Sequence, residues 1–347
     1  TQTGAEFKTL ATYRAGSCAQ CHDEPWRHNK YAQFENSRHA DIVFETTTGS
    51  NGNTNNLNDC ARCHDGRVYI QFTQGYTAST PGKIDVKTLK EANSVDVTCA
   101  VCHDPHGNTS FASLRQAPAS SDTLGNGYAY TVGGNGQVCM NCHKARRNNV
   151  TYMSSTITAT WGPHHSVQAD NFLGKNAAEF GSAYLTNSHQ FAVTDACVTC
   201  HMVATTDTGT VNRDKVGGHS FRLENPDNGY EHTTACTNCH GPITSFDDFI
   251  APTDYDGDGS VESVSGEVDG LLHNLRVLLP PTGIDSISWQ MIKDMNDLTV
   301  KKSYWNYQLI NNDGSKGMHN SKFTFDVLVK TLAALGSVIP VELVSFD

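Results

Sequence analysis

Six copies of one short motif dominate the sequence: two cysteines separated by two residues, with a histidine directly after the second cysteine. All twelve cysteines of the 347-residue chain belong to these copies. With 16 histidines present, six such histidines by chance have a probability of about 10⁻⁸. A disulfide framework needs no histidine after each pair, a zinc ribbon uses two pairs, and a redox Cys-x-x-Cys occurs once per domain. Cys-x-x-Cys-His is instead the attachment motif of c-type haem.

The motif predicts six covalently bound haem c groups. Two thiols add across the vinyl groups on one edge of the porphyrin, and the adjacent histidine then reaches the iron from one face. The predicted attachment residues are Cys18, Cys21, Cys60, Cys63, Cys99, Cys102, Cys139, Cys142, Cys197, Cys200, Cys236 and Cys239. The predicted iron ligands on this face are His22, His64, His103, His143, His201 and His240. Because every cysteine is used, we expect haems and not disulfides to cross-link the chain.

The composition agrees with a core built partly from haem. Only 37% of the residues are hydrophobic, against a usual ~45–50% in globular domains. Between the motifs the chain is rich in glycine, asparagine, serine and threonine, which is typical of loops. We therefore predict a fold of mostly irregular coil with short helices and few short strands, wrapped around a stacked haem chain. One such strand is expected over residues 68–73.

The haem motifs end well before the end of the chain. We expect residues 1–240 to form the six-haem-binding region, and residues 241–347 to form a C-terminal region without haem motifs that packs on the haem array. Hydrophobic periodicity predicts a helix over Val264–Leu279, followed by two prolines that stop it. A second helix is expected over Ser321–Leu335, with Asn320 or Ser321 as its N-cap and a glycine just past its end.

The residue on the second face of each iron separates an electron carrier from an enzyme. Ten histidines lie outside the motifs, which exceeds the six needed for bis-histidine ligation. His273 is excluded because it lies opposite the apolar stripe of its predicted helix and should face solvent. The predicted second ligands are His39, His106, His189, His219, His319 and one of the adjacent pair His164 and His165. Each of them has the alternative of being a hydrogen-bonded surface histidine.

His106 is the most informative of these histidines because it lies three residues after His103. Three residues cannot pass around the edge of the macrocycle, so the two side chains cannot bind opposite faces of one iron. If His106 is a ligand, it binds a neighbouring iron and brings two haems close together. The alternative is a solvated histidine in a turn.

A separate acidic segment predicts a calcium site. Asp254, Asp256 and Asp258 stand at positions one, three and five of a D-x-D-x-D-G loop, whose oxygens converge on a hard cation. Position twelve is Ser265 and not the glutamate of an EF-hand, and Glu262 at position nine is a possible substitute. An ordinary acidic turn is the alternative.

Charge and hydropathy exclude other classes of protein. The net charge of −11 argues against nucleic acid as a partner, and no run approaches the ~18 apolar residues of a membrane span. Thioether attachment of haem takes place outside the cytoplasm, so we expect an exported protein whose signal peptide has been removed.

Beyond the motifs, several segments resemble those of a known family. Residues 162–174, 196–202 with 217–221, 254–272 and 306–320 are similar to segments of multihaem outer-surface cytochromes of metal-reducing bacteria, among them hexahaem cytochromes that polymerise into conductive filaments. The resemblance implies that His164, and not His165, is the ligand of its pair. It also implies a ligand shared between subunits, for which His28 is the nearest match, although it follows its motif by six residues rather than three. The tail 340–346 resembles a segment that precedes the sorting domain of type IX secreted proteins, which implies a trimmed product at the cell surface.

Together these features predict a protein that is not an enzyme and that transfers electrons through six haems at the cell surface, with the periplasm as the alternative location. The expected partners are further copies of itself in a homopolymer, other redox proteins and extracellular acceptors such as metal oxides. The alternative function is a multihaem reductase of nitrite, hydroxylamine or a sulfur oxyanion with one open haem. Such enzymes often have lysine in place of one motif histidine, and no Cys-x-x-Cys-Lys occurs here.

Overall fold

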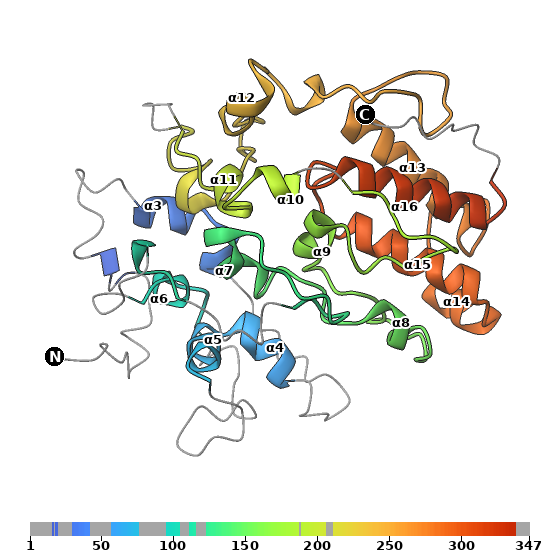
Figure 1. Cartoon of the computed structure of the whole chain (residues 1–347), viewed down its shortest axis with the longest axis horizontal. Helices are drawn as coiled ribbons and strands as arrows, with labels where there is room; N and C mark the ends of the chain where they lie inside the picture. The colour runs from blue at the N-terminus through green and yellow to red at the C-terminus, as the bar shows by residue number, and fades with distance from the viewer. Residues whose placement is uncertain are drawn as a thin grey trace. The chain divides into compact units, whose positions relative to one another are not determined.

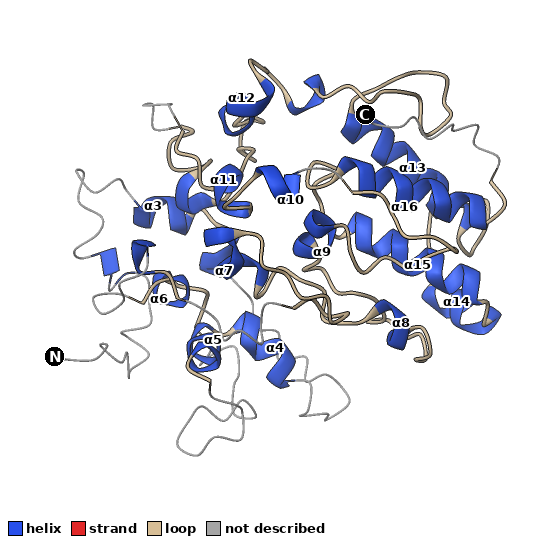
Figure 2. Ribbon diagram, viewed as in Figure 1, coloured by secondary structure: helices blue, strands red, loops and turns tan. Residues whose placement is uncertain are grey.

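The chain folds into short helices joined by long irregular segments. The computed structural model describes residues 16, 18–19, 30–41, 57–75, 95–104, 111–115, 123–186, 189–205 and 211–337. Within these ranges there is no strand, and extended pairing is limited to isolated bridges such as Glu224 with Glu231 (Figure 2). The predicted fold class of coil with short helices is therefore confirmed, with isolated bridges in place of the few short strands.

The chain divides into two compact units. The first unit is drawn from residues 1–122, 133–142 and 195–243, and the second from 123–132, 143–194 and 244–347. All twelve cysteines belong to the first unit. The predicted boundary at residue 240 separates the region with haem motifs from the region without them, and this boundary stays a prediction.

The described helices of the first unit are short, and five of them carry cysteines of the haem motifs (Figure 1). The α-helices are α3 (Lys30–Glu35), α4 (Leu57–His64), α5 (Gly66–Thr73), α6 (Cys99–Cys102), α7 (Gln137–Met140), α11 (Cys197–His201) and α12 (Thr234–His240). The 3-10 helices are η2 (Arg38–Asp41), η6 (Phe111–Ser113), η8 (Gly134–Gly136) and η9 (Gly218–Ser220). Helix α3 packs against η9, and α4 packs against α5 and places the second motif beside it.

The strand predicted over residues 68–73 is wrong, because this segment lies in helix α5. The Asp65 carboxylate caps the helix by accepting hydrogen bonds from the backbone N–H groups of Arg67 (3.0 Å) and Val68 (3.1 Å). Tyr69 and Ile70 are buried on the helix. The run of β-branched and aromatic residues favours a strand, but this preference depends strongly on context and is overridden here by the cap and the packing.

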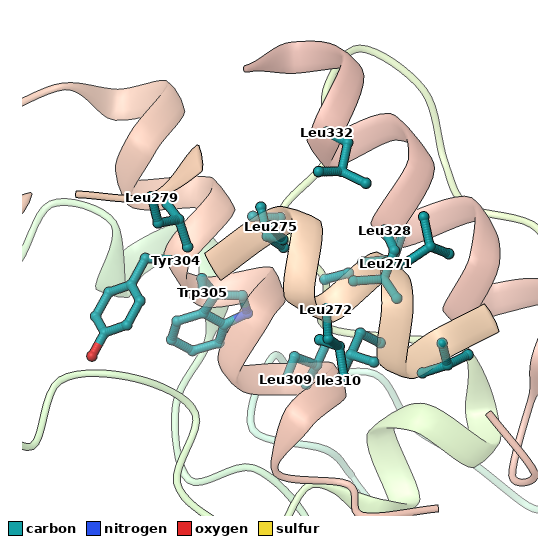
Figure 3. Close-up of a cluster of buried hydrophobic side chains, with 14 of the residues drawn as sticks. Leu271, Leu272, Leu275, Leu279, Tyr304, Trp305, Leu309, Ile310, Leu328 and Leu332 are labelled. Carbon is teal, nitrogen blue, oxygen red and sulfur yellow. The ribbon is translucent and has the colours of Figure 1, made fainter. Parts of the chain in front are cut away.

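The second unit contains the longest described helices and the main apolar core. Its helices are α8 (Asn149–Tyr152), α9 (Gln168–Leu173), α10 (His189–Ala192), η10 (Phe246–Asp248), α13 (Val264–Leu278), α14 (Trp289–Met295), α15 (Leu298–Asn311) and α16 (Ser321–Ala334). Leucines of α13 and α16 meet Trp305 and Leu309 of α15 in one cluster of buried side chains (Figure 3). None of the helices in the described part of the chain is long and apolar enough to cross a membrane.

The two helices predicted in the C-terminal region are confirmed. Helix α13 begins after Ser263, whose hydroxyl accepts a hydrogen bond from the Gly266 N–H, and it ends before Pro280. Helix α16 has Asn320 as its N-cap, accepting from the Phe323 N–H, and ends just before Gly336. Sequence periodicity did not predict α15, which lies between them.

Candidate haem-binding sites

Four of the haem motifs have both cysteines within one short helix, which is α4, α6, α11 or α12. Residues three apart on a helix are neighbours on its surface, and α6 and α11 contain both cysteines of their motifs. Ten cysteines have described side chains; none of these ten is in a disulfide, and all but the exposed Cys239 are partly buried. Cys21 and the side chain of Cys60 lie outside the described residues.

Thiols from different motifs come together in pairs. Hydrogen bonds join Cys18 to Cys99, Cys63 to Cys142, and Cys139 to Cys197. The bond from Cys99 lowers the pKa of Cys18 to about 7. The attachment edges of the first and third motifs, of the second and fourth, and of the fourth and fifth are therefore adjacent.

Three motif histidines are held in the tautomer that suits metal binding. The Nδ1 of His103 lies 2.7 Å from the Ala112 carbonyl oxygen, and the Nδ1 of His201 lies 2.9 Å from the Phe221 carbonyl oxygen. The Nδ1 of His143 lies 3.1 Å from the side-chain oxygen of Gln168. Because carbonyl oxygens only accept hydrogen bonds, each Nδ1 carries the proton and each Nε2 lone pair is available to a metal. The residues thus fit haem iron.

The remaining motif histidines are less constrained. His64 is half-buried at the end of α4, and His240 is exposed at the end of α12. His22 lies outside the described residues.

His219 faces the motif histidine His103. Their ring centroids are 6.2 Å apart and their planes are inclined by 30°. Two imidazoles that bind one metal from opposite sides, each at a metal–nitrogen distance of about 2 Å, have centroids roughly 6 Å apart. Burial, with smaller effects of Lys30 and His103, lowers the pKa of His219 to about 4, so this ring is neutral, as a metal ligand must be.

Two glycines bring the backbone of His219 into place. Gly217 and Gly218 have φ of +66° and +51°, and a Cβ at these positions would lie 2.1 Å from the Val203 carbonyl oxygen and 2.4 Å from the Gln33 side-chain oxygen. Only glycine tolerates both the left-handed conformation and this close approach. Gln33 also accepts a hydrogen bond from the His219 N–H at 3.1 Å.

His319 lies close to the motif histidine His143. Burial lowers the pKa of His143, the hydrogen bond to Gln168 opposes this shift, and the nearby charge of His319 lowers the pKa further. The Nδ1 of His319 donates to the Asp313 carboxylate at 2.8 Å, so Nε2 is the ring nitrogen left for a metal. The sequence analysis did not identify Gln168, which lies 25 residues from His143, or Asp313, which lies six residues before His319.

The other predicted second ligands have varied surroundings. His39 is half-buried, and its ring lies edge-on to Phe221 at 4.9 Å, so it is beside the residue that accepts from His201. His164 is half-buried and has a Nδ1 contact to Ser166 at 3.3 Å. His189 is half-buried at the start of α10. His28 and His106 lie outside the described residues, and ligation by these five histidines stays a prediction.

Three histidines were not assigned to iron. His273 is exposed and lies 3.3 Å from Asp285, as its place opposite the apolar stripe predicted. His165 is also exposed. His232, in contrast, is fully buried; its Nε2 contacts the Val203 carbonyl oxygen at 3.1 Å, and its Nδ1 has no partner within the described part of the chain.

The acidic segment forms a compact loop against the start of α13. Carboxylate oxygens of Asp254, Asp256 and Glu267 lie within 4.8 Å of one another, as do those of Asp256, Asp258 and Glu262. The sequence analysis missed Glu267, which lies two positions beyond the twelfth residue of the loop. Glu267 is fully buried and accepts from three backbone N–H groups of the loop, among them that of Tyr255 at 2.7 Å.

Two solved structures resemble this chain in fold. No protein-family model and no curated protein sequence matches the chain. The crystal structure of the outer cell wall cytochrome OcwA is similar, with a TM-score of 0.52 and 18% identity, over 95% of this chain and 57% of that one. An undecahaem cytochrome from the S-layer of Carboxydothermus ferrireducens is similar, with a TM-score of 0.55 and 20% identity, over 94% of this chain and 46% of that one. The chain thus spans about half the length of each. It has the fold of the multihaem cytochromes.

Proposed function

We propose that this protein carries six covalently bound c-type haems and transfers electrons between them outside the cytoplasm. The observation that carries the proposal is the pair His103 and His219, which face each other at the spacing expected of two ligands on one iron. The motif cysteines next to His103 supply the covalent attachment. The pair His143 and His319 supports a second site of the same kind.

Haem supplies a one-electron carrier when it is bound, and the residues of this chain determine how it is used. The cysteines attach it, and the Nδ1 hydrogen bonds of His103, His143 and His201 orient the imidazoles. A histidine on both faces leaves no coordination position for a substrate, which favours electron transfer over the reductase alternative. The paired thiols favour closely spaced haems, because adjacent attachment edges keep neighbouring rings in contact.

The location and the assembly state belong to the same proposal. An exported cytochrome at the cell surface agrees with the printed descriptions of the two similar structures, which are an outer cell wall protein and an S-layer protein. The resemblance to filament-forming cytochromes supports a homopolymer in which His28 binds iron in the next subunit. Other redox proteins and metal oxides are the proposed electron acceptors. Calcium in the loop of Asp254 stays a prediction.

Mass spectrometry and low-temperature EPR of the purified holoprotein test this function. The expected mass is that of the chain plus six haems, and the expected ferric spectrum contains only low-spin signals. A stoichiometric high-spin ferric signal would mean that one iron has an open face, and the reductase alternative would then replace electron transfer as the function.

A further inference from the structure

The Asp313 carboxylate holds the distal histidine of one proposed site. Asp313 follows α15, and its side chain is only 4% exposed. Its Oδ1 accepts the Nδ1–H of His319 at 2.8 Å, and its Oδ2 accepts the hydroxyl of Ser315. The Ser315 hydroxyl in turn accepts the backbone N–H of His319 at 3.3 Å. The imidazole is thereby fixed by a buried anionic acceptor.

The same loop is connected to the motif histidine on the other side of the site. The Gln168 side-chain oxygen accepts from His143 at 3.1 Å. Its amide nitrogen donates to the backbone carbonyls of Asn312 and Asp313, each at 3.3 Å. One hydrogen-bonded network therefore holds both imidazoles, with a neutral amide behind His143 and a carboxylate behind His319.

The pair His103 and His219 has different acceptors. His103 donates to the neutral carbonyl of Ala112. The Nδ1 of His219 is buried and has no hydrogen-bond partner among the residues that the structure describes. The two pairs thus differ in the charge that lies behind the distal ring.

This difference acts on the iron through the imidazole. A carboxylate that accepts the Nδ1–H makes the ring more basic and a stronger electron donor to the metal. Such a ligand, with a buried negative charge nearby, stabilises the ferric form more than the ferrous form, because the ferric form carries one more positive charge. Reduction adds one electron at the iron, and the proton stays in the hydrogen bond between His319 and Asp313.

We propose that Asp313 is a positioning residue that lowers the reduction potential of the haem bound by His143 and His319 below that of the haem bound by His103 and His219. The proposal rests on the bis-histidine ligation proposed above. It implies that the two haems differ in reduction potential, and that a buried carboxylate causes this difference by acting on the distal ligand.

The test is a potentiometric titration of the holoprotein, followed by EPR, in which each low-spin ferric signal is monitored as it is reduced. His319→Ala identifies the signal of this haem, because that signal is lost from the low-spin set. In Asp313→Asn the same signal should remain low-spin but be reduced at a higher potential. We expect the preference of this iron for the ferric over the ferrous form to fall about tenfold, at the low end of such indirect effects. A tenfold change corresponds to a rise in the reduction potential of about 59 mV for one electron. Asp313→Glu should restore much of the shift.

Asp285→Asn is the matched control. Asp285 lies beside the exposed His273 in the same unit, so this variant removes one carboxylate from an Asp–His pair that is not a ligand. Its potentials should equal those of the wild type. Three outcomes would overturn the role of Asp313. The potential could be unchanged in Asp313→Asn, the two variants could show equal shifts, or Asp313→Asn could lose the low-spin signal. If instead His319→Ala leaves every iron low-spin, the proposed ligand pair itself is wrong.

Discussion

The chemistry of single histidines separates iron ligands from surface residues in this chain. His103, His143 and His201 have Nδ1 bound to a carbonyl-type oxygen, which directs Nε2 to a metal. His273 is also a histidine but lies outside the motifs, and it is exposed beside Asp285. In the three motif histidines a carbonyl-type oxygen at Nδ1 leaves Nε2 for a metal, whereas His273 is exposed and lies beside a carboxylate.

The replacement His219→Ala tests the proposed ligand pair. The haem attached through Cys99 and Cys102 should lose its second axial ligand, because His219 is the ring that faces His103. The expected result is one high-spin ferric signal in EPR, converted back to low-spin by added imidazole. His273→Ala serves as the control and should leave all irons low-spin. A His219→Ala protein without a high-spin signal would remove His219 from the ligand set.

At the scale of elements, capping and tertiary contacts decide between helix and strand. In α5 the apolar residues alternate poorly with polar ones, and β propensity alone predicts a strand. The Asp65 side chain reverses that preference because it is fully buried and accepts from the N–H groups of Arg67, Val68 and Val95. It also pairs with the Arg67 guanidinium at 2.9 Å.

The variant Asp65→Ala measures this contribution. Loss of the cap and of a buried charged acceptor should lower the free energy of unfolding by about 3 kcal/mol. Urea denaturation followed by far-UV circular dichroism provides the measurement. Asp269→Asn is the comparison, because Asp269 pairs with Lys316 at the exposed surface, where ion pairs contribute about 0–1 kcal/mol. Equal losses in both variants would show that the cap does not stabilise α5.

The C-terminal helices show where periodicity is informative. Helix α13 presents leucines and other apolar residues on one face and was predicted from its periodicity. Helix α16 was predicted together with its caps, and it buries Thr324, Asp326 and Thr331 among its apolar residues. Helix α15 buries polar residues among apolar ones. The Asn306 side chain, for example, accepts from the Ala178 N–H at 2.7 Å and donates to the Ala178 carbonyl at 3.0 Å. A buried polar residue that is satisfied by a distant segment weakens the apolar pattern without weakening the helix.

For the whole molecule, the distribution of apolar residues supports haem as part of the core. The main buried cluster lies between Ala145 and Leu332 and belongs to the second unit. The twelve cysteines belong to the first unit. Flat apolar macrocycles attached there would add apolar material to the interior of that unit.

Assembly is the prediction that belongs to this scale. A chain with six haems cannot enclose every ring, and exposed haem edges are apolar surfaces of the kind that mark interaction sites. Two different ends that fit each other form a heterologous contact, which gives a filament when it does not close. Electron microscopy of concentrated holoprotein should show linear filaments, and His28→Ala should shorten them and create a high-spin iron. Wild-type protein that stays monomeric would contradict the filament, and intact low-spin filaments of His28→Ala would exclude His28 from the contact.

The sequence by itself contains the six motifs, and it predicts the attachment residues and the first axial ligand of each iron. Covalent attachment needs two thiols and an imidazole within five consecutive residues, so a local pattern is enough to identify it. Two long C-terminal helices were equally readable, because their periodicity and caps are also local. The tertiary structure alone decided that His219 faces His103, that His319 approaches His143, and that Gln168 and Asp313 hold the rings. Apart from the bond between Asp313 and His319, which are six residues apart, these contacts join residues distant in the chain, and they exist only because folding brings the segments that carry them together.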